Sequence, residues 1–114
     1  MTFQAGETNE VTRAQIARYA EAVGDFNPMH LDEEFAKAAG MPSVIAHGPL
    51  SLALILDVVV GQVGAGAMRS FDARLRAPVV PGDRLRVIPT DEGLEARNAA
   101  DNVVATVNLD MGGK

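Results

Sequence analysis

The sequence predicts a single-domain α+β fold, in which an antiparallel β-sheet wraps around a central apolar helix. Residues 50–60 are apolar in nearly every direction that a helix presents, which is typical of a helix buried inside a domain. After residue 66 the apolar residues recur at every second position, as they do in strands with one buried face. The helix and the sheet can bury each other if the sheet wraps the helix.

Composition limits the alternatives. A chain of 114 residues with no cysteine fits one domain, residues 1–114, without disulfides, and residues 111–114 are expected to be flexible. The start lacks the layout of a signal peptide and the apolar run is too short to cross a bilayer, so we expect a cytoplasmic protein with no membrane partner. A net charge of −5 argues against nucleic acid as a partner.

The first helix is predicted over residues 13–23, after a short N-terminal strand. Thr12 and Gln15 have the spacing of a capping box, and apolar residues follow at helical intervals. Gly24 is expected to end this helix.

The second helix is predicted over residues 33–39, with Asp32 as its N-cap. Between the two helices, Pro28 disfavours helical geometry at Asn27. We therefore expect residues 25–31 to form an ordered loop.

The third helix begins near Pro49, a residue suited to a first helical turn, and is expected to be buried on all sides. Strands are predicted over 71–77, 84–87 and 103–111, with a weaker one over 92–99. The unpaired edges of such a sheet favour the joining of a second copy, so we expect a dimer.

The loop "DFNPMH" places a carboxylate and an imidazole close together in a chain that has only two histidines. If Asp25 and His30 project into one pocket they can share a water, with proton transfer to and from both groups. Five residues would separate them on a helix, whereas a loop held by Pro28 can bring them together. The alternative is a turn in which Asp25 caps backbone groups and His30 has no chemical role.

The second histidine lies in "IAHGPL", directly before the apolar helix. There, free backbone N–H groups and the helix dipole can stabilise a developing oxyanion, and Gly48 allows a ligand to approach the backbone. The alternative is a tight entry turn in which His47 forms an internal hydrogen bond.

Taken together, the two segments resemble the MaoC-like dehydratases, the (R)-specific enoyl-CoA hydratase family of hot-dog folds. The stretch "YAEAVGDFNPMHLDEEFAKAAG" followed by "VIAHGPLSLAL" carries the resemblance, and "RLRAPVVPGDRL" is similar to the strand-turn-strand of the family. The residues that match the hydratase motif are Tyr19, Gly24, Asp25, Asn27, Pro28, Met29, His30 and Ala36.

The resemblance implies an enzyme, a carbon-oxygen lyase that reversibly hydrates trans-2-enoyl thioesters to (R)-3-hydroxyacyl thioesters in fatty acid metabolism. It implies that Asp25 is the base, His30 its acid-base partner and the Gly48 N–H the donor to the thioester carbonyl. Asn27 and His47 would have supporting roles.

The resemblance also implies the partners. The acyl group would be carried by CoA or acyl carrier protein, with no metal and no separate cofactor, and Arg74 and Arg76 are candidates for binding the carrier. We expect a homodimer or higher homo-oligomer, or a heteromer with another hot-dog subunit. The acyl chain length and the direction of the reaction are left open.

Three departures from the family pattern stand beside the resemblance. Pro49 stands where many relatives have a methionine, and it removes one N–H from the helix start. Some relatives have a serine in the middle of this helix, where this chain has Leu56 and Asp57. The stretch "RLRAPV" lacks the aromatic residue that the family usually has before the basic one. Two other functions are kept: an acyl-thioester-binding subunit of a heteromeric dehydratase, and a hot-dog thioesterase that uses Asp57.

Overall fold

The computed structural model describes residues 2–112. The elements, in chain order, are β1 (Gly6–Glu7), α1 (Arg13–Val23), α2 (Pro28–Leu31), α3 (Glu33–Ala38), α4 (Gly48–Val63), a 3-10 turn (Ala65–Ala67), β2 (Ser70–Leu75), β3 (Arg86–Pro89), β4 (Gly93–Arg97) and β5 (Val103–Asp110).

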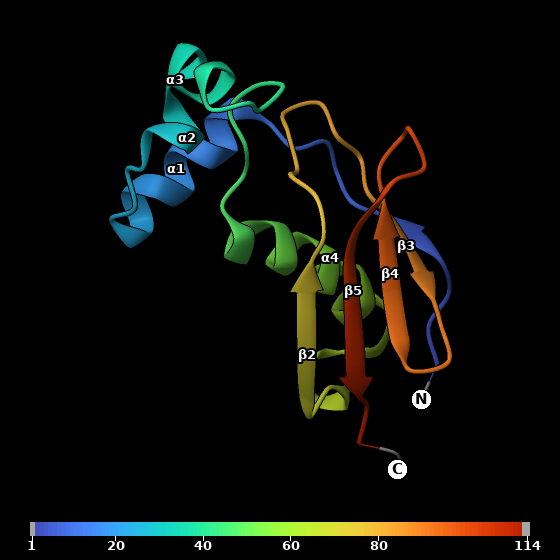
Figure 1. Ribbon diagram of the computed structural model, residues 1–114. Helices are drawn as coiled ribbons and strands as arrows, with labels where there is room; N and C mark the ends of the chain where they lie inside the picture. Colours follow the sequence, from blue (N-terminus) through green and yellow to red (C-terminus); the bar gives the residue numbers. More distant parts are fainter. Residues whose placement is uncertain (1, 113–114) are drawn as a thin grey trace.

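The five strands form one sheet in the order β1-β3-β4-β5-β2, and every neighbouring pair is antiparallel. Helix α4 lies against one face of this sheet (Figure 1). The core between them includes Ile55 and Val59 from α4 and Val87, Ala96 and Val107 from the strands. The predicted α+β architecture is confirmed.

Helices α1, α2 and α3 gather beyond one end of the sheet, near the N-terminus of α4 (Figure 1). The predicted caps of two of these helices are confirmed: Thr12 Oγ1 accepts the Gln15 N–H, and the Asp32 carboxylate accepts the Phe35 N–H. Gly24 ends α1 in the left-handed conformation, at φ 73°. The three helices form a small unit that reaches past the sheet.

The loop predicted over residues 25–31 is partly wrong, because Pro28 begins the single-turn helix α2. Asn27 does have the extended backbone that a following proline favours, with ψ 128°. Its side chain then accepts the Met29 N–H at 2.9 Å and caps the turn. Proline fits the first helical position because its fixed φ is helical and the N–H that it lacks would have no partner there.

The strand predicted over residues 84–87 lies two residues later, as β3. Residues 80–85 turn instead toward the segment before α1, where Gly82 N–H donates to Val11 O and Val11 N–H donates to Asp83 O. Leu85 N–H donates to the Thr8 hydroxyl. The backbone at the start of the predicted strand therefore bonds to residues 8–11 and does not join β4.

The prediction that the apolar helix is buried on all sides is wrong for the single chain. Only one face of α4 is buried, and Ala53 and Asp57 are exposed. The sheet covers only one side of the helix, so apolar side chains on the other side of α4 stay partly exposed. Strand β2 shows the same effect: Phe71 is 46% and Leu75 is 49% exposed, because β2 is an edge strand with no neighbour on one side.

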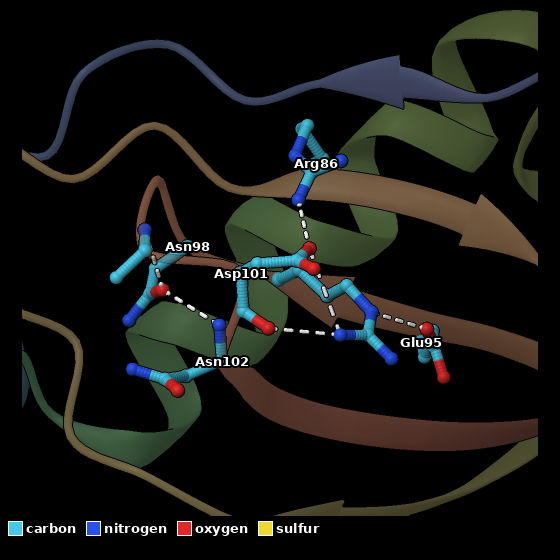
Figure 2. Close-up of polar contacts among 7 residues, drawn as sticks. Arg86, Glu95, Asn98, Asp101 and Asn102 are labelled. Atoms are coloured by element: carbon cyan, nitrogen blue, oxygen red, sulfur yellow. Dashed lines mark hydrogen bonds and ion pairs between the residues drawn. The ribbon is translucent and has the colours of Figure 1, made fainter.

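The loop between β4 and β5 is held by an ion-pair network (Figure 2). Asp101 has a left-handed backbone, at φ 67°, and its carboxylate pairs with Arg86 and Arg97. Arg97 also pairs with Glu95. The hydrogen bond from Arg86, and then the charge of Arg97, lower the pKa of the Asp101 carboxyl.

Within residues 2–112, no helix combines the length and the apolar character that crossing a membrane requires. Flexibility is predicted for residues 111–114, and two of these, at positions 113 and 114, lie outside the described part of the chain.

Candidate active site

The turn between α1 and α2 brings the two groups of the "DFNPMH" loop together. Asp25 directly follows Gly24, and its N–H donates to Ala20 O, which closes the end of α1. Its carboxylate is exposed and accepts the Asn27 N–H at 3.3 Å. Ligand-type atoms of Asp25, His30 and His47 lie within 4.8 Å of one another. The carboxylate and the imidazole are thus close enough to act on the same small molecule.

The hydrogen bond of His30 indicates which nitrogen is available. Its Nδ1 lies 2.7 Å from Ile45 O, and a carbonyl oxygen can only accept, so Nδ1 carries the proton. In the neutral ring Nε2 therefore has a free lone pair. The side chain is half-buried, so this nitrogen is able to take a proton from a bound molecule and return it.

His47 lies behind this pair and is almost completely buried, with 1% of the residue exposed. Its ring stacks on the ring of His30, with centroids 3.7 Å apart and an interplanar angle of 22°. Its Nε2 lies 3.1 Å from the backbone oxygen of Asp25. Tyr19 packs on the ring as well, with centroids 4.9 Å apart. His47 thus forms the internal hydrogen bond that the alternative interpretation of this segment describes.

Gly48 is the first residue of α4, so its N–H has no acceptor inside the helix. The neighbouring Leu75 approaches closely: a Cβ added to Gly48 would lie 2.7 Å from Leu75 Cδ1. Gly48 directly follows His47, whose ring stacks on His30, so the amide belongs to the segment that carries this group. A carbonyl oxygen placed there would meet a free N–H at the positive end of a helix.

The two arginines belong to a different surface feature, which lies on the sheet. Arg74 and Arg76 are exposed residues that line a depression of about 570 Å³ on the sheet, together with Asp72 and Asn108. Asp91, Glu92 and Glu95 also line this depression, so its carboxylates outnumber its guanidinium groups. The role of the arginines in carrier binding stays a prediction.

Asp57 lies in the second half of α4. It lies nine residues along α4 from Gly48, which corresponds to roughly 13 Å of helix, and it is exposed. A thioesterase that depends on Asp57 would work at a place distinct from Asp25 and His30.

The three residues Asp25, His30 and His47 also have the spacing of a metal site. A metal bound to two imidazoles lies about 2 Å from each nitrogen and in the plane of both rings. Because the two rings are stacked face to face, their planes run nearly parallel and do not meet at such a point. The arrangement therefore suits proton transfer better than chelation by both histidines.

Sequence reasoning missed Glu33, which secures the segment leading to the site. Its carboxylate accepts the Val44 N–H at 3.1 Å and pairs with Arg13 and Lys37, so it joins α1, α3 and the chain before His47. The Val44 N–H, and then Arg13, lower the pKa of the Glu33 carboxyl. The four-residue spacing of Glu33 and Lys37 is the one sequence signal available, since it favours a helical ion pair, but no pattern indicates the bond to Val44.

Comparison with solved structures agrees with this description. An R-hydratase from Pseudomonas aeruginosa superposes with a TM-score of 0.77 at 27% identity, over 96% of this chain and 79% of that one. The predicted hot-dog fold is confirmed by this similarity, and the structure has the same mixed helix and antiparallel five-stranded sheet.

Comparison of sequences shows the family. A UPF0336 protein of Saccharopolyspora erythraea is 37% identical over 90% of this chain and 70% of its own length. Enoyl-CoA hydratase 2, peroxisomal, of Arabidopsis thaliana is 38% identical over 75% of this chain, which spans only 28% of that longer protein. The family model described as "MaoC like domain" matches residues 1–112. The chain is therefore a member of the MaoC-like domain family, whose relatives include hydratases and dehydratases.

Proposed function

We propose that this chain reversibly hydrates trans-2-enoyl thioesters to (R)-3-hydroxyacyl thioesters. One observation carries the proposal: the Asp25 carboxylate and the His30 imidazole lie within 4.8 Å of each other and of the ring of His47, the residue that directly precedes the first N–H of α4. Hydration needs these three groups, since a water must be deprotonated, a proton must be returned, and negative charge must be stabilised on the thioester oxygen.

The proposed step is balanced as follows. Asp25 accepts a proton from water, and the water oxygen forms a bond to Cβ of the enoyl group. The π electrons move toward the thioester carbonyl, where the Gly48 N–H stabilises the oxyanion. In its doubly protonated form, with Nδ1–H bonded to Ile45 O, His30 delivers the Nε2 proton to Cα and becomes neutral. The proton that Asp25 took from water then passes to Nε2 and restores both groups. Dehydration runs through the same transition state in reverse, so metabolite levels decide the direction.

The supporting residues have contacts suited to their proposed roles. The Asn27 side chain caps α2 and keeps the turn between Asp25 and His30 in shape. The acyl carrier is CoA or acyl carrier protein, consistent with what the names of the relatives state about those proteins.

We propose that the active form is a homodimer. Strand β2 is an edge strand with the exposed apolar residues Phe71 and Leu75, and Leu75 approaches Gly48. Pairing of β2 with a second copy would cover both residues. A pairing with an unlike hot-dog subunit would use the same edge, and the complete Asp25 and His30 pair would then make this chain the catalytic member.

The test is an assay of the purified protein with enoyl-CoA thioesters of several lengths and chiral analysis of the product. Asp25→Asn and His30→Ala should each lower turnover by at least about a hundredfold, because each removes one partner of the proton transfer. Asp57→Ala is the control and should hydrate the substrate at the wild-type rate.

Two outcomes would contradict the proposal. Folded Asp25→Asn and His30→Ala variants with near-normal turnover would remove both residues from the reaction. Release of free CoA by the wild type that is lost in Asp57→Ala would favour a thioesterase instead.

A further inference from the structure

We infer that His47 is a positioning residue that holds both Asp25 and His30 in register for the reaction. The inference rests on the proposed function. His47 contacts each of the two residues in a different way, through a hydrogen bond to Asp25 and through ring stacking on His30. It is the one side chain for which the described structure gives a direct contact with both.

The hydrogen bond fixes the backbone of Asp25. The acceptor is a carbonyl oxygen, so the donor is the Nε2–H of His47 and the ring is present as that tautomer. Asp25 itself is exposed and lies in a turn, where few other contacts restrain it. The buried N-cap residue of α4 therefore ties the backbone of Asp25, and with it the root of the exposed side chain, to the start of the core helix.

The other ring nitrogen of His47, Nδ1, is buried without a hydrogen-bond partner within the described residues, which is energetically unfavourable. Such buried, unpaired polar atoms in folded proteins call for an explanation. An apolar aromatic side chain would avoid this cost but would leave Asp25 O without its donor. The choice of histidine is explained if the bond to Asp25 is needed.

The stacking restricts His30. One face of the His30 ring lies against His47, and its Nδ1–H donates to Ile45 O. The flat contact sets the tilt of the ring, while the hydrogen bond sets its rotation in the plane. Together they determine where Nε2 points. Tyr19 packs on His47 in turn and limits the movement of that ring.

The test compares three variants at position 47 and its neighbour. His47→Phe keeps a flat ring but loses the donor, and His47→Gln places an amide N–H near the position of Nε2. Ser51→Ala is the matched control, since Ser51 is buried and its Oγ donates to the backbone oxygen of His47, whereas the hydrogen bond to Asp25 comes from the ring.

In His47→Phe we expect kcat to fall by about 10- to 100-fold with KM changed by less than about threefold, because misplacement of reacting groups costs rate more than binding. His47→Gln should recover at least about a third of the wild-type kcat. Ser51→Ala should lower thermal stability with kcat close to that of the wild type. Equal losses of kcat in His47→Phe and Ser51→Ala, or in His47→Phe and His47→Gln, would overturn the inference.

Nuclear magnetic resonance gives a readout that does not depend on activity. The chain has only two histidines, so a His47 variant contains a single imidazole, that of His30. In His47→Phe the amide signals of Asp25 and Asn27 and the ring signals of His30 should move and broaden, whereas in Ser51→Ala they should not. Unchanged signals would overturn the inference even if hydration is observed. Moved signals in a protein without hydratase activity would reject the proposed function and keep the positioning role of His47.

Discussion

Asp25 is held in place mainly by its backbone. Its N–H bonds back to α1 and its carbonyl oxygen accepts a hydrogen bond from His47, while among residues 2–112 the carboxylate accepts only a long bond from the Asn27 N–H. A base needs this combination, because the group must stay in one position while its oxygens remain available to water. The rigidity is therefore provided by atoms that take no part in proton transfer.

The role of the Gly48 amide can be tested with two substitutions that share one steric effect. Both Gly48→Ala and Gly48→Pro add a Cβ that would meet the movable Cδ1 of Leu75, but only proline removes the N–H. If the amide stabilises the oxyanion, kcat of Gly48→Pro should be about a hundredfold below that of Gly48→Ala. The measurement is steady-state hydration by both purified variants.

Proline is tolerated at the first helical position, and the extended backbone of His47 accommodates a following proline. Both variants are therefore expected to fold, which circular dichroism would verify. Equal kcat values in the two would exclude the amide as the oxyanion donor.

At the residue scale the sequence allowed the main pair to be predicted but not its surroundings. The meeting of Asp25 and His30 depends on a short local turn with a proline, which sequence spacing describes well. The stack of His30 on His47 joins residues 17 positions apart and depends on how α2 sits against the start of α4. No local pattern contains that information.

At the scale of elements, β2 and α4 both have apolar side chains that the single chain leaves exposed or half-buried. Alternating residues correctly predicted a strand near 71–77, and an apolar run predicted a helix near 49–64. Burial could not be predicted in the same way, because it depends on what lies beside an element. β2 has a neighbour on one side only, and α4 has the sheet on one side only. Both are as apolar as elements that are covered completely.

Substitution on β2 should therefore change the association of the protein. Phe71→Asp places a charge on the open edge and should shift a wild-type dimer toward monomer, because an unpaired charge is costly to bury in an interface. Phe35→Asp on α3 is the matched control, since both phenylalanines are 46% exposed. Sedimentation velocity at micromolar concentration distinguishes the two states.

Phe35→Asp should sediment as the wild type does. A monomeric wild type, or dissociation of both variants to the same extent, would show that β2 is not the surface on which copies meet.

At the scale of the whole molecule, two carboxyl groups link distant parts of the chain. Glu33 joins α1, α3 and the segment before His47, and Asp101 joins β3 to the turn between β4 and β5. Hydrogen bonds and nearby guanidinium groups lower the pKa of both carboxyls below their ordinary values. The ionised form is therefore favoured more by the folded state than by the unfolded state.

The sign of the pH dependence follows from these lowered pKa values. The stabilisation is fully present above about pH 5, where both carboxyls are also ionised in the unfolded chain, and it is lost as the pH falls through the folded-state pKa values. In Glu33→Gln with Asp101→Asn, the free energy of unfolding should be lower at pH 7 and should fall less steeply from pH 5 to pH 3. Urea denaturation across this range measures both effects.

Glu34→Gln is the control, because Glu34 is adjacent on α3 and forms no ion pair among residues 2–112. It should keep the wild-type slope. A doubly substituted protein with that same slope would show that these two carboxyls do not govern acid stability.

The contact between Tyr19 and His47 has a consequence for the study of this protein. The chain has no tryptophan and a single tyrosine, and that tyrosine packs on the buried histidine. Its ultraviolet fluorescence therefore arises one side chain away from Asp25 and His30. Because Tyr19 is the single tyrosine and there is no tryptophan, a change in this fluorescence reports on the surroundings of His47 without an added label.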